Sequence, residues 1–215
     1  MTPAFLAILL GGSGILVAAV LTRLSLWLPN GDREARPGPR RSALMALAGA
    51  AVGAWAALAQ PTPLAAVLTA LLGWQLLVIA VIDAEHFLLP DQLTLPLLAT
   101  SGLAALLLDQ TAPLDAVIGA AVGFAGLWLL AFAYHRLRGR EGLGDGDPIL
   151  LAAGGAWVGW IGLPSVLLWA SAAGLSFVAA RLLTGGRVSG EDRLPFGPCL
   201  AAGIWLTWIL GPLGL

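Results

Sequence analysis

Long uncharged apolar stretches alternate with short polar segments along this chain. The uncharged stretches are 1–22, 42–82, 116–135, 148–180 and 194–215. A helix needs about 20 apolar residues to cross the roughly 30 Å hydrocarbon core of a bilayer, and about 17–25 are tolerated. Helices also satisfy their own backbone hydrogen bonds in lipid. The pattern therefore predicts an all-α, polytopic membrane protein.

Two of these stretches are long enough for two spans each. Within 42–82, the segment Gln60-Pro-Thr-Pro63 predicts a turn, because proline cannot continue the hydrogen-bond ladder of a helix. Within 148–180, we place the second turn near Gly162-Leu-Pro164. The other predicted spans are 1–28, about 93–108, 116–135 and about 197–214. The sequence thus predicts eight membrane helices, the first of which is too long and too weakly charged for a signal peptide.

The charge pattern orients these spans. All eleven basic residues are arginines, and the predicted spans place every one of them on the same side of the membrane. By the positive-inside rule this side is cytoplasmic. It comprises the segments 29–41, 83–92, 135–147 and 181–196. The opposite turns are those near 60–63, 109–115 and 162–164, and they hold no basic residue. Both termini are therefore predicted to lie outside.

The bulk composition excludes several classes of protein. With 59% hydrophobic and 11% charged residues, the chain lies outside the range of soluble domains, so membrane lipid is its expected surrounding. The arginines form no basic stripe, so no nucleic acid is expected as a partner. Cys199 is the single cysteine and is expected to be a buried structural thiol. His86 and His135 lack the further ligands of a zinc site, so we expect no metal and no cofactor.

Acidic residues that border the apolar stretches are the candidates for chemistry, because charge is costly there. Asp83 follows the apolar run LLVIAVI directly and is expected within the end of that helix. Asp147 closes the glycine-rich segment Gly142-Leu-Gly-Asp-Gly-Asp147 and precedes Pro148, so capping of the next helix is an alternative role for it. Asp91 follows Leu89-Pro90 and is expected to be the N-cap of the span near 93–108.

The predicted topology brings Asp83 and Asp147 to one membrane face. Two carboxylates a few Å apart share a proton, because like charges cannot both ionise at that distance. The ionised member can take a proton from water, while the protonated one polarises a scissile carbonyl and later protonates the leaving amine. The pattern therefore favours a membrane-embedded aspartyl peptidase. An ion- or proton-coupled transporter is the alternative, and it predicts acidic residues near the midplane and internal repeats.

Three motifs follow one another in a fixed order within residues 64–215. They are Ile82-Asp-Ala-Glu-His-Phe-Leu-Leu-Pro-Asp-Gln-Leu-Thr-Leu-Pro96, the segment from Gly142 to Trp157, and Arg193-Leu-Pro-Phe-Gly-Pro198. On these motifs the chain resembles the type IV prepilin leader peptidases, which are integral-membrane aspartyl proteases. The resemblance implies that Asp83 and Asp147 are catalytic and that Gly144 and Gly146 support their loop.

The resemblance also implies a substrate and a location. The substrates would be prepilin or pseudopilin precursors of type IV pilus and type II secretion systems, cleaved at the cytoplasmic face of the bacterial inner membrane. Such leaders are basic, and the acidic residues expected to contact them are Glu85, Asp91 and Asp145.

Two features depart from the family pattern. Bifunctional members carry a zinc domain with two Cys-x-x-Cys pairs between the first two spans and also methylate the new N-terminus. Here only residues 29–41 stand in that place, without a cysteine, so we expect neither zinc nor N-methyltransferase activity. Ile149 replaces a usual lysine, which leaves open an inactive member that acts in pilus or secretion assembly. We divide the chain into an N-terminal helical hairpin, 1–63, and a peptidase domain, 64–215.

Overall fold

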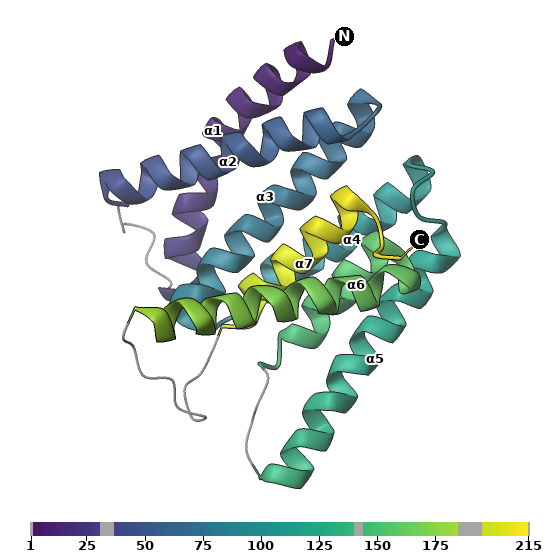
Figure 1. The fold of residues 1–215 in the computed structure, drawn as a ribbon. Coiled ribbons are helices and arrows are strands. Elements are labelled where there is room, and N and C mark those ends of the chain that lie inside the picture. Colours follow the sequence, from purple (N-terminus) through teal and green to yellow (C-terminus); the bar gives the residue numbers. More distant parts are fainter. Residues whose placement is uncertain (1, 31–36, 140–143, 185–194, 215) are drawn as a thin grey trace.

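Helices make up all the regular structure in the part of the chain that the computed structural model describes, residues 2–30, 37–139, 144–184 and 195–214. They are α1 (Pro3–Asn30), α2 (Pro39–Ala59), α3 (Pro63–His86), α4 (Asp91–Leu107), α5 (Pro113–Arg138), α6 (Asp147–Leu183) and α7 (Gly197–Leu210). The helices α1 and α2 lie on one side of α3, and α5 lies on the opposite side of the molecule (Figure 1). The all-α prediction is confirmed.

Five of these helices are long and apolar enough to cross a membrane, by length and composition: α1, α2, α3, α5 and α6. The apolar helices α4 and α7 are shorter, with 17 and 14 residues. At 1.5 Å per residue they are about 26 and 21 Å long, less than the roughly 30 Å of a hydrocarbon core. The count of eight spans, the position of the termini and the domain division at residue 63 stay predictions.

Four of the helices, α1, α2, α3 and α5, begin at a proline. Pro39, Pro63 and Pro113 occupy the first turns of α2, α3 and α5. A backbone N–H at these positions would have no partner within the helix, so proline, which lacks this group, loses no hydrogen bond there. Thr62 caps α3, since its hydroxyl oxygen accepts a hydrogen bond of 3.2 Å from the backbone N–H of Ala65. The predicted turn between the second and third helices is confirmed.

The helix α6 consists of two helical segments that meet at Gly159. Gly159 has φ 74° and ψ 168°, a conformation that glycine adopts without a steric penalty. The break predicted near Gly162-Leu-Pro164 is therefore misplaced, since Pro164 lies inside the second segment.

The helix α3 is the centre of the bundle. Of the 24 residues of α3, 13 are buried, and they are distributed along the length of the helix from Ala65 to Asp83. It packs against α1, α2, α4 and α7. The indole Nε1 of Trp74 donates a 2.9 Å hydrogen bond to the carbonyl oxygen of Gly49 on α2, which fixes the N-terminal hairpin to α3. The hairpin is thus part of the same core as the remaining helices.

Close backbone contacts hold two helix pairs together. A Cβ atom on Gly14 of α1 would overlap the backbone of Gly49 on α2. In the same way, a Cβ atom on Gly119 of α5 would overlap the carbonyl group of Gly155 on α6. Small residues let membrane helices approach this closely, and the gain is van der Waals contact.

Candidate active site

Asp83 lies in the last turn of α3, with 6% of its surface exposed. The helix ends at Phe87, which has a left-handed conformation (φ 54°) and whose N–H donates to the carbonyl oxygen of Asp83. The carboxylate oxygen Oδ2 accepts a 2.8 Å hydrogen bond from the backbone N–H of Gly197, the first residue of α7. Free N–H groups and the dipole at a helix N-terminus favour an anion. The start of α7 therefore holds the Asp83 carboxylate.

Asp147 is the first residue of α6 and is 3% exposed. Its Oδ2 accepts a 2.9 Å hydrogen bond from the N–H of Gly144, and its own N–H donates to the carbonyl oxygen of Gly144 at 3.1 Å. The N-cap of α6 is Gly146, so the alternative role of Asp147 as the capping residue is wrong. Instead, the carboxylate closes a tight turn over the glycines that precede it.

Gly146 supports this turn through its lack of a side chain. A Cβ atom there would lie 2.5 Å from Cβ of Leu89, in the segment between α3 and α4. The glycine turn before α6 therefore packs directly on the segment that follows Asp83. Gly142, also in the predicted motif, lies outside the described residues.

The structure brings the two predicted aspartates together. The start of α7 holds Asp83, and the glycine turn that leads into Asp147 packs on Leu89, six positions after Asp83, so both carboxylates lie at the same end of the bundle. Among the described residues, Oδ1 of neither aspartate has a hydrogen-bond partner. The ends of α3, α6 and α7 thus present two buried carboxylates, each fixed through one oxygen, with the other oxygen available to a water molecule.

The three acidic residues expected to contact a leader have different surroundings. Asp91 is exposed at the first position of α4, and the N-cap is Pro90, so the prediction that Asp91 is the N-cap is wrong. Asp145 is exposed in the glycine turn. Glu85 is engaged in a bidentate ion pair with Arg41 of α2, at 2.7 and 2.8 Å.

Sequence reasoning missed two residues of this region. Gly197 belongs to the third motif, but nothing in the local sequence indicates that its N–H binds a carboxylate 114 positions away. Arg41 was counted only as a marker of topology, and its partner Glu85 is 44 positions away. Cys199 was expected to be buried but is partly exposed. Each of these features depends on contacts between distant parts of the chain.

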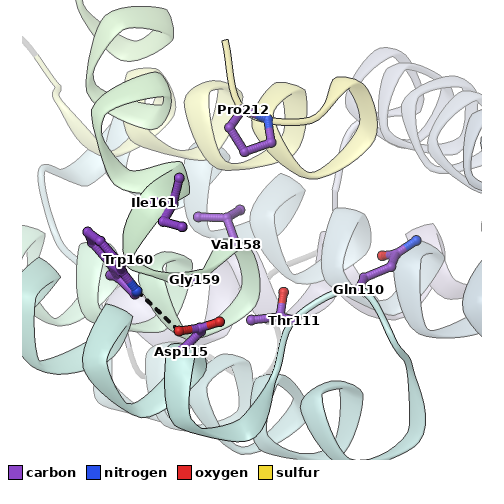
Figure 2. Close-up of a pocket in the computed structure, with 8 residues that line it drawn as sticks. All are labelled: Gln110, Thr111, Asp115, Val158, Gly159, Trp160, Ile161 and Pro212. Atoms are coloured by element: carbon purple, nitrogen blue, oxygen red, sulfur yellow. Dashed lines mark hydrogen bonds between the residues drawn. The ribbon is translucent and has the colours of Figure 1, made fainter. Parts of the chain in front are cut away.

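A hollow lies around Gly159, at the far end of the first segment of α6 (Figure 2). Twelve helical residues of 1.5 Å each separate it from Asp147, or about 18 Å. Here Thr111 donates a 2.7 Å hydrogen bond to the carbonyl oxygen of Trp157, and Trp160 Nε1 donates a 3.1 Å hydrogen bond to Asp115 Oδ1. These bonds stabilise the break in α6, so we assign the hollow a structural role.

No group of three or more His, Cys, Asp or Glu side chains that could hold a metal ion occurs within residues 2–30, 37–139, 144–184 and 195–214. At the helix ends described above, Asp83 and Asp147 offer two carboxylates, and the backbone of Gly144 and Gly197 offers N–H groups that bind them. Buried carboxylates of this kind are suited to exchange protons with a bound water.

Known proteins resemble this chain over the region that contains both aspartates. The sequence profile of the type IV leader peptidase family matches residues 70–179, just over half of the chain. A prepilin leader peptidase/N-methyltransferase of Aeromonas salmonicida (strain A449) is 47% identical over 142 residues, which cover 66% of this chain and 48% of that protein. The protein of the same name from Dickeya chrysanthemi is 48% identical over 139 residues, with 63% and 48% covered.

The corresponding protein of Pseudomonas aeruginosa is 42% identical over 142 residues, again with 66% of this chain and 48% of the relative covered. The chain spans about half the length of the curated relatives it matches. No solved structure shows a significant match to it.

Proposed function

Since the chain belongs to the type IV leader peptidase family, we propose that it is an aspartic endopeptidase that cleaves the leader of type IV prepilin or pseudopilin precursors. The observation that carries the proposal is that Asp83 and Asp147 are both buried at one end of the bundle, where the glycine turn before α6 packs on the segment that follows Asp83. A buried carboxylate pair is suited to hold one shared proton.

The two aspartates divide the chemistry between them. The ionised carboxylate takes a proton from a water molecule between the two Oδ1 atoms, and the resulting hydroxide attacks the scissile carbonyl carbon. The protonated carboxyl group donates a hydrogen bond to the carbonyl oxygen as negative charge develops on it. The protonated carboxyl group then gives its proton to the leaving amine, and the C–N bond breaks. The hydrogen bonds from Gly144 and Gly197 keep both carboxylates in place during these steps.

The proposed substrate fits the surroundings of the pair. The scissile bond lies next to an apolar substrate helix, and cleavage takes place at the cytoplasmic face of the bacterial inner membrane. The exposed carboxylates of Asp91 and Asp145 are the proposed contacts for the basic leader. Methyl transfer is not part of this proposal, because the segment 29–41 holds no cysteine for a zinc domain.

The two other functions considered from the sequence are less well supported. A transporter is not favoured, because the family to which the chain belongs consists of leader peptidases. An inactive assembly factor is suggested only by Ile149, a partly buried residue two positions after Asp147. The retained carboxylate pair favours an active enzyme.

The test is cleavage of a prepilin-type substrate in membranes that contain wild-type protein, Asp83→Asn or Asp147→Asn. We expect each variant to lose at least about 10³-fold in cleavage rate, because either substitution removes a member of a unit that acts together. Asp115→Asn is the matched control, since Asp115 lies in the structural hollow near Gly159, and it should cleave at the wild-type rate. Cleavage at the wild-type rate by either Asn variant would refute the proposed mechanism.

A further inference from the structure

Arg41 joins three helices at the end of the molecule that carries Asp83. Its guanidinium group donates hydrogen bonds of 2.7 and 2.8 Å to Oε1 and Oε2 of Glu85 in the last turn of α3. The same group donates a 2.9 Å hydrogen bond to Oγ of Ser25, a fully buried residue of α1. Ser25 in turn donates to the carbonyl oxygen of Thr22. One arginine of α2 thus fixes the end of α3 to α1.

Local helix energetics do not explain the presence of Glu85. The C-terminus of a helix carries partial negative charge, so a glutamate in the last turn is unfavourable there by itself. Arg41 in the first turn of α2 is also unfavourable, because the N-terminus of a helix carries partial positive charge. Each residue therefore lies at the wrong helix end for its charge, and the ion pair compensates both. A bidentate arginine–carboxylate pair also fixes the relative orientation of its two partners.

The ion pair lies immediately beside a proposed catalytic residue. Glu85 is two positions after Asp83, and α3 ends at the next residue, His86. The imidazole Nε2 of His86 lies 3.8 Å from Oε2 of Glu85. The last turn of a helix is the part that frays most readily. Arg41 and Ser25 precede residue 70, where the match to the leader peptidase family begins. The support that Arg41 and Ser25 give this turn therefore comes from the N-terminal hairpin, outside the matched segment.

We propose that Arg41 is a positioning residue for the peptidase: through Glu85 and Ser25 it holds the last turn of α3, and with it the Asp83 carboxylate, in the geometry required for cleavage. This inference rests on the proposed function. It assigns Glu85, an exposed residue, a partner within the protein itself, in place of the contact with a basic leader expected from the sequence. A small displacement of a reacting group can cost about 10²-fold in rate, so a partial loosening of this turn is enough for a measurable effect.

The experiment compares steady-state kinetics of Arg41→Gln, Glu85→Gln, the double variant with both changes, and the charge-swapped variant Arg41→Glu with Glu85→Arg. Arg40→Gln is the control, because Arg40 is the exposed neighbour with the same charge. We expect each single variant to lose about tenfold in kcat with KM within about twofold of wild type. The double variant should be no slower than either single variant, because both remove the same interaction.

The charge-swapped variant separates positioning from local helix stability. Glu85→Arg alone places a cation at the C-terminus of α3, which stabilises the helix, so a purely structural role predicts no loss of kcat. Positioning predicts that Glu85→Arg is slow and that adding Arg41→Glu restores at least half of the lost rate. Arg41→Gln at the wild-type rate would overturn the inference. So would a Glu85→Gln variant that raises KM alone, since this would make Glu85 a contact for the leader.

Hydrogen exchange of the amides around residues 83–87 gives a readout that does not need activity. We expect these amides to exchange faster in Arg41→Gln and Glu85→Gln than in wild type, with the same increase in both variants. In the charge-swapped variant the exchange rate should return towards that of wild type. Unchanged exchange in both single variants would overturn the inference. If wild-type protein does not cleave a prepilin-type substrate, the proposed function fails, while exchange still decides whether Arg41 holds this turn.

Discussion

Gly197 offers the sharpest test of how the proposed catalytic pair, Asp83 and Asp147, is held. It is buried at the first position of α7, and its N–H is the hydrogen-bond donor to Asp83. Replacing it with alanine would place a Cβ atom 2.7 Å from Oδ2, 2.8 Å from Cγ and 3.0 Å from Cβ of Asp83. Ordinary van der Waals contact begins at 3.4 Å, so the carboxylate would have to move by about 0.7 Å.

The size of the effect follows from this displacement. Because Cγ and Cβ of Asp83 are also too close, rotation of the carboxylate alone cannot relieve the overlap, and the whole side chain has to shift. A shift of about 0.7 Å would stretch the 2.8 Å hydrogen bond from Gly197 beyond the usual range of 2.7–3.2 Å. Hydrogen bonds to charged groups are worth about 1.5–3 kcal/mol. Misplacement of a reacting group by about 1 Å costs about 10²-fold in rate.

We therefore expect Gly197→Ala to lower the cleavage rate by between about tenfold and 10²-fold, with normal amounts of protein in the membrane. Initial rates on a prepilin-type substrate in detergent give the measurement. Gly102→Ala is the matched control, because a Cβ atom at Gly102 of α4 would meet nothing within 4 Å, and its rate should equal that of wild type. A wild-type rate for Gly197→Ala would refute the assignment of Gly197 as the group that fixes Asp83.

Two further predictions concern the scaffold and the chemistry. Gly119→Ala should lower the stability of the folded protein by about 1–3 kcal/mol, because its Cβ atom would force α5 away from the Gly155 carbonyl group of α6. Thermal unfolding in detergent tests this, with Gly126→Ala on the open side of α5 as the control, and equal midpoints for the two variants would contradict it. Leader cleavage should persist after treatment with EDTA or 1,10-phenanthroline, since the described residues group no three metal-binding side chains. Loss of activity that zinc restores would count against a mechanism based on two carboxylates alone.

Helix positions were largely predictable because apolar length is a local property of the sequence. The turns near Gln60 and Asp109 lie where polar residues and proline interrupt apolar runs, and the structure begins α3 at Pro63 and α5 at Pro113. The break in α6 was misplaced because Gly159 and Pro164 lie in the same apolar run. Both residues can interrupt a helix. Which of them does so depends on packing, here on the hydrogen bond from Thr111 to the Trp157 carbonyl oxygen.

The sequence alone determined the all-α architecture, because long apolar runs require helices in lipid. It also predicted Asp83 and Asp147 as the reacting pair, because the energetic cost of charge beside an apolar run limits which residues can stand there. The tertiary structure decided how these carboxylates are held. The bond from Gly197 to Asp83 and the ion pair between Arg41 and Glu85 join positions 114 and 44 residues apart, and no periodicity in the chain indicates such pairs. They arise only when whole helices pack, since packing determines which helix end meets which side chain.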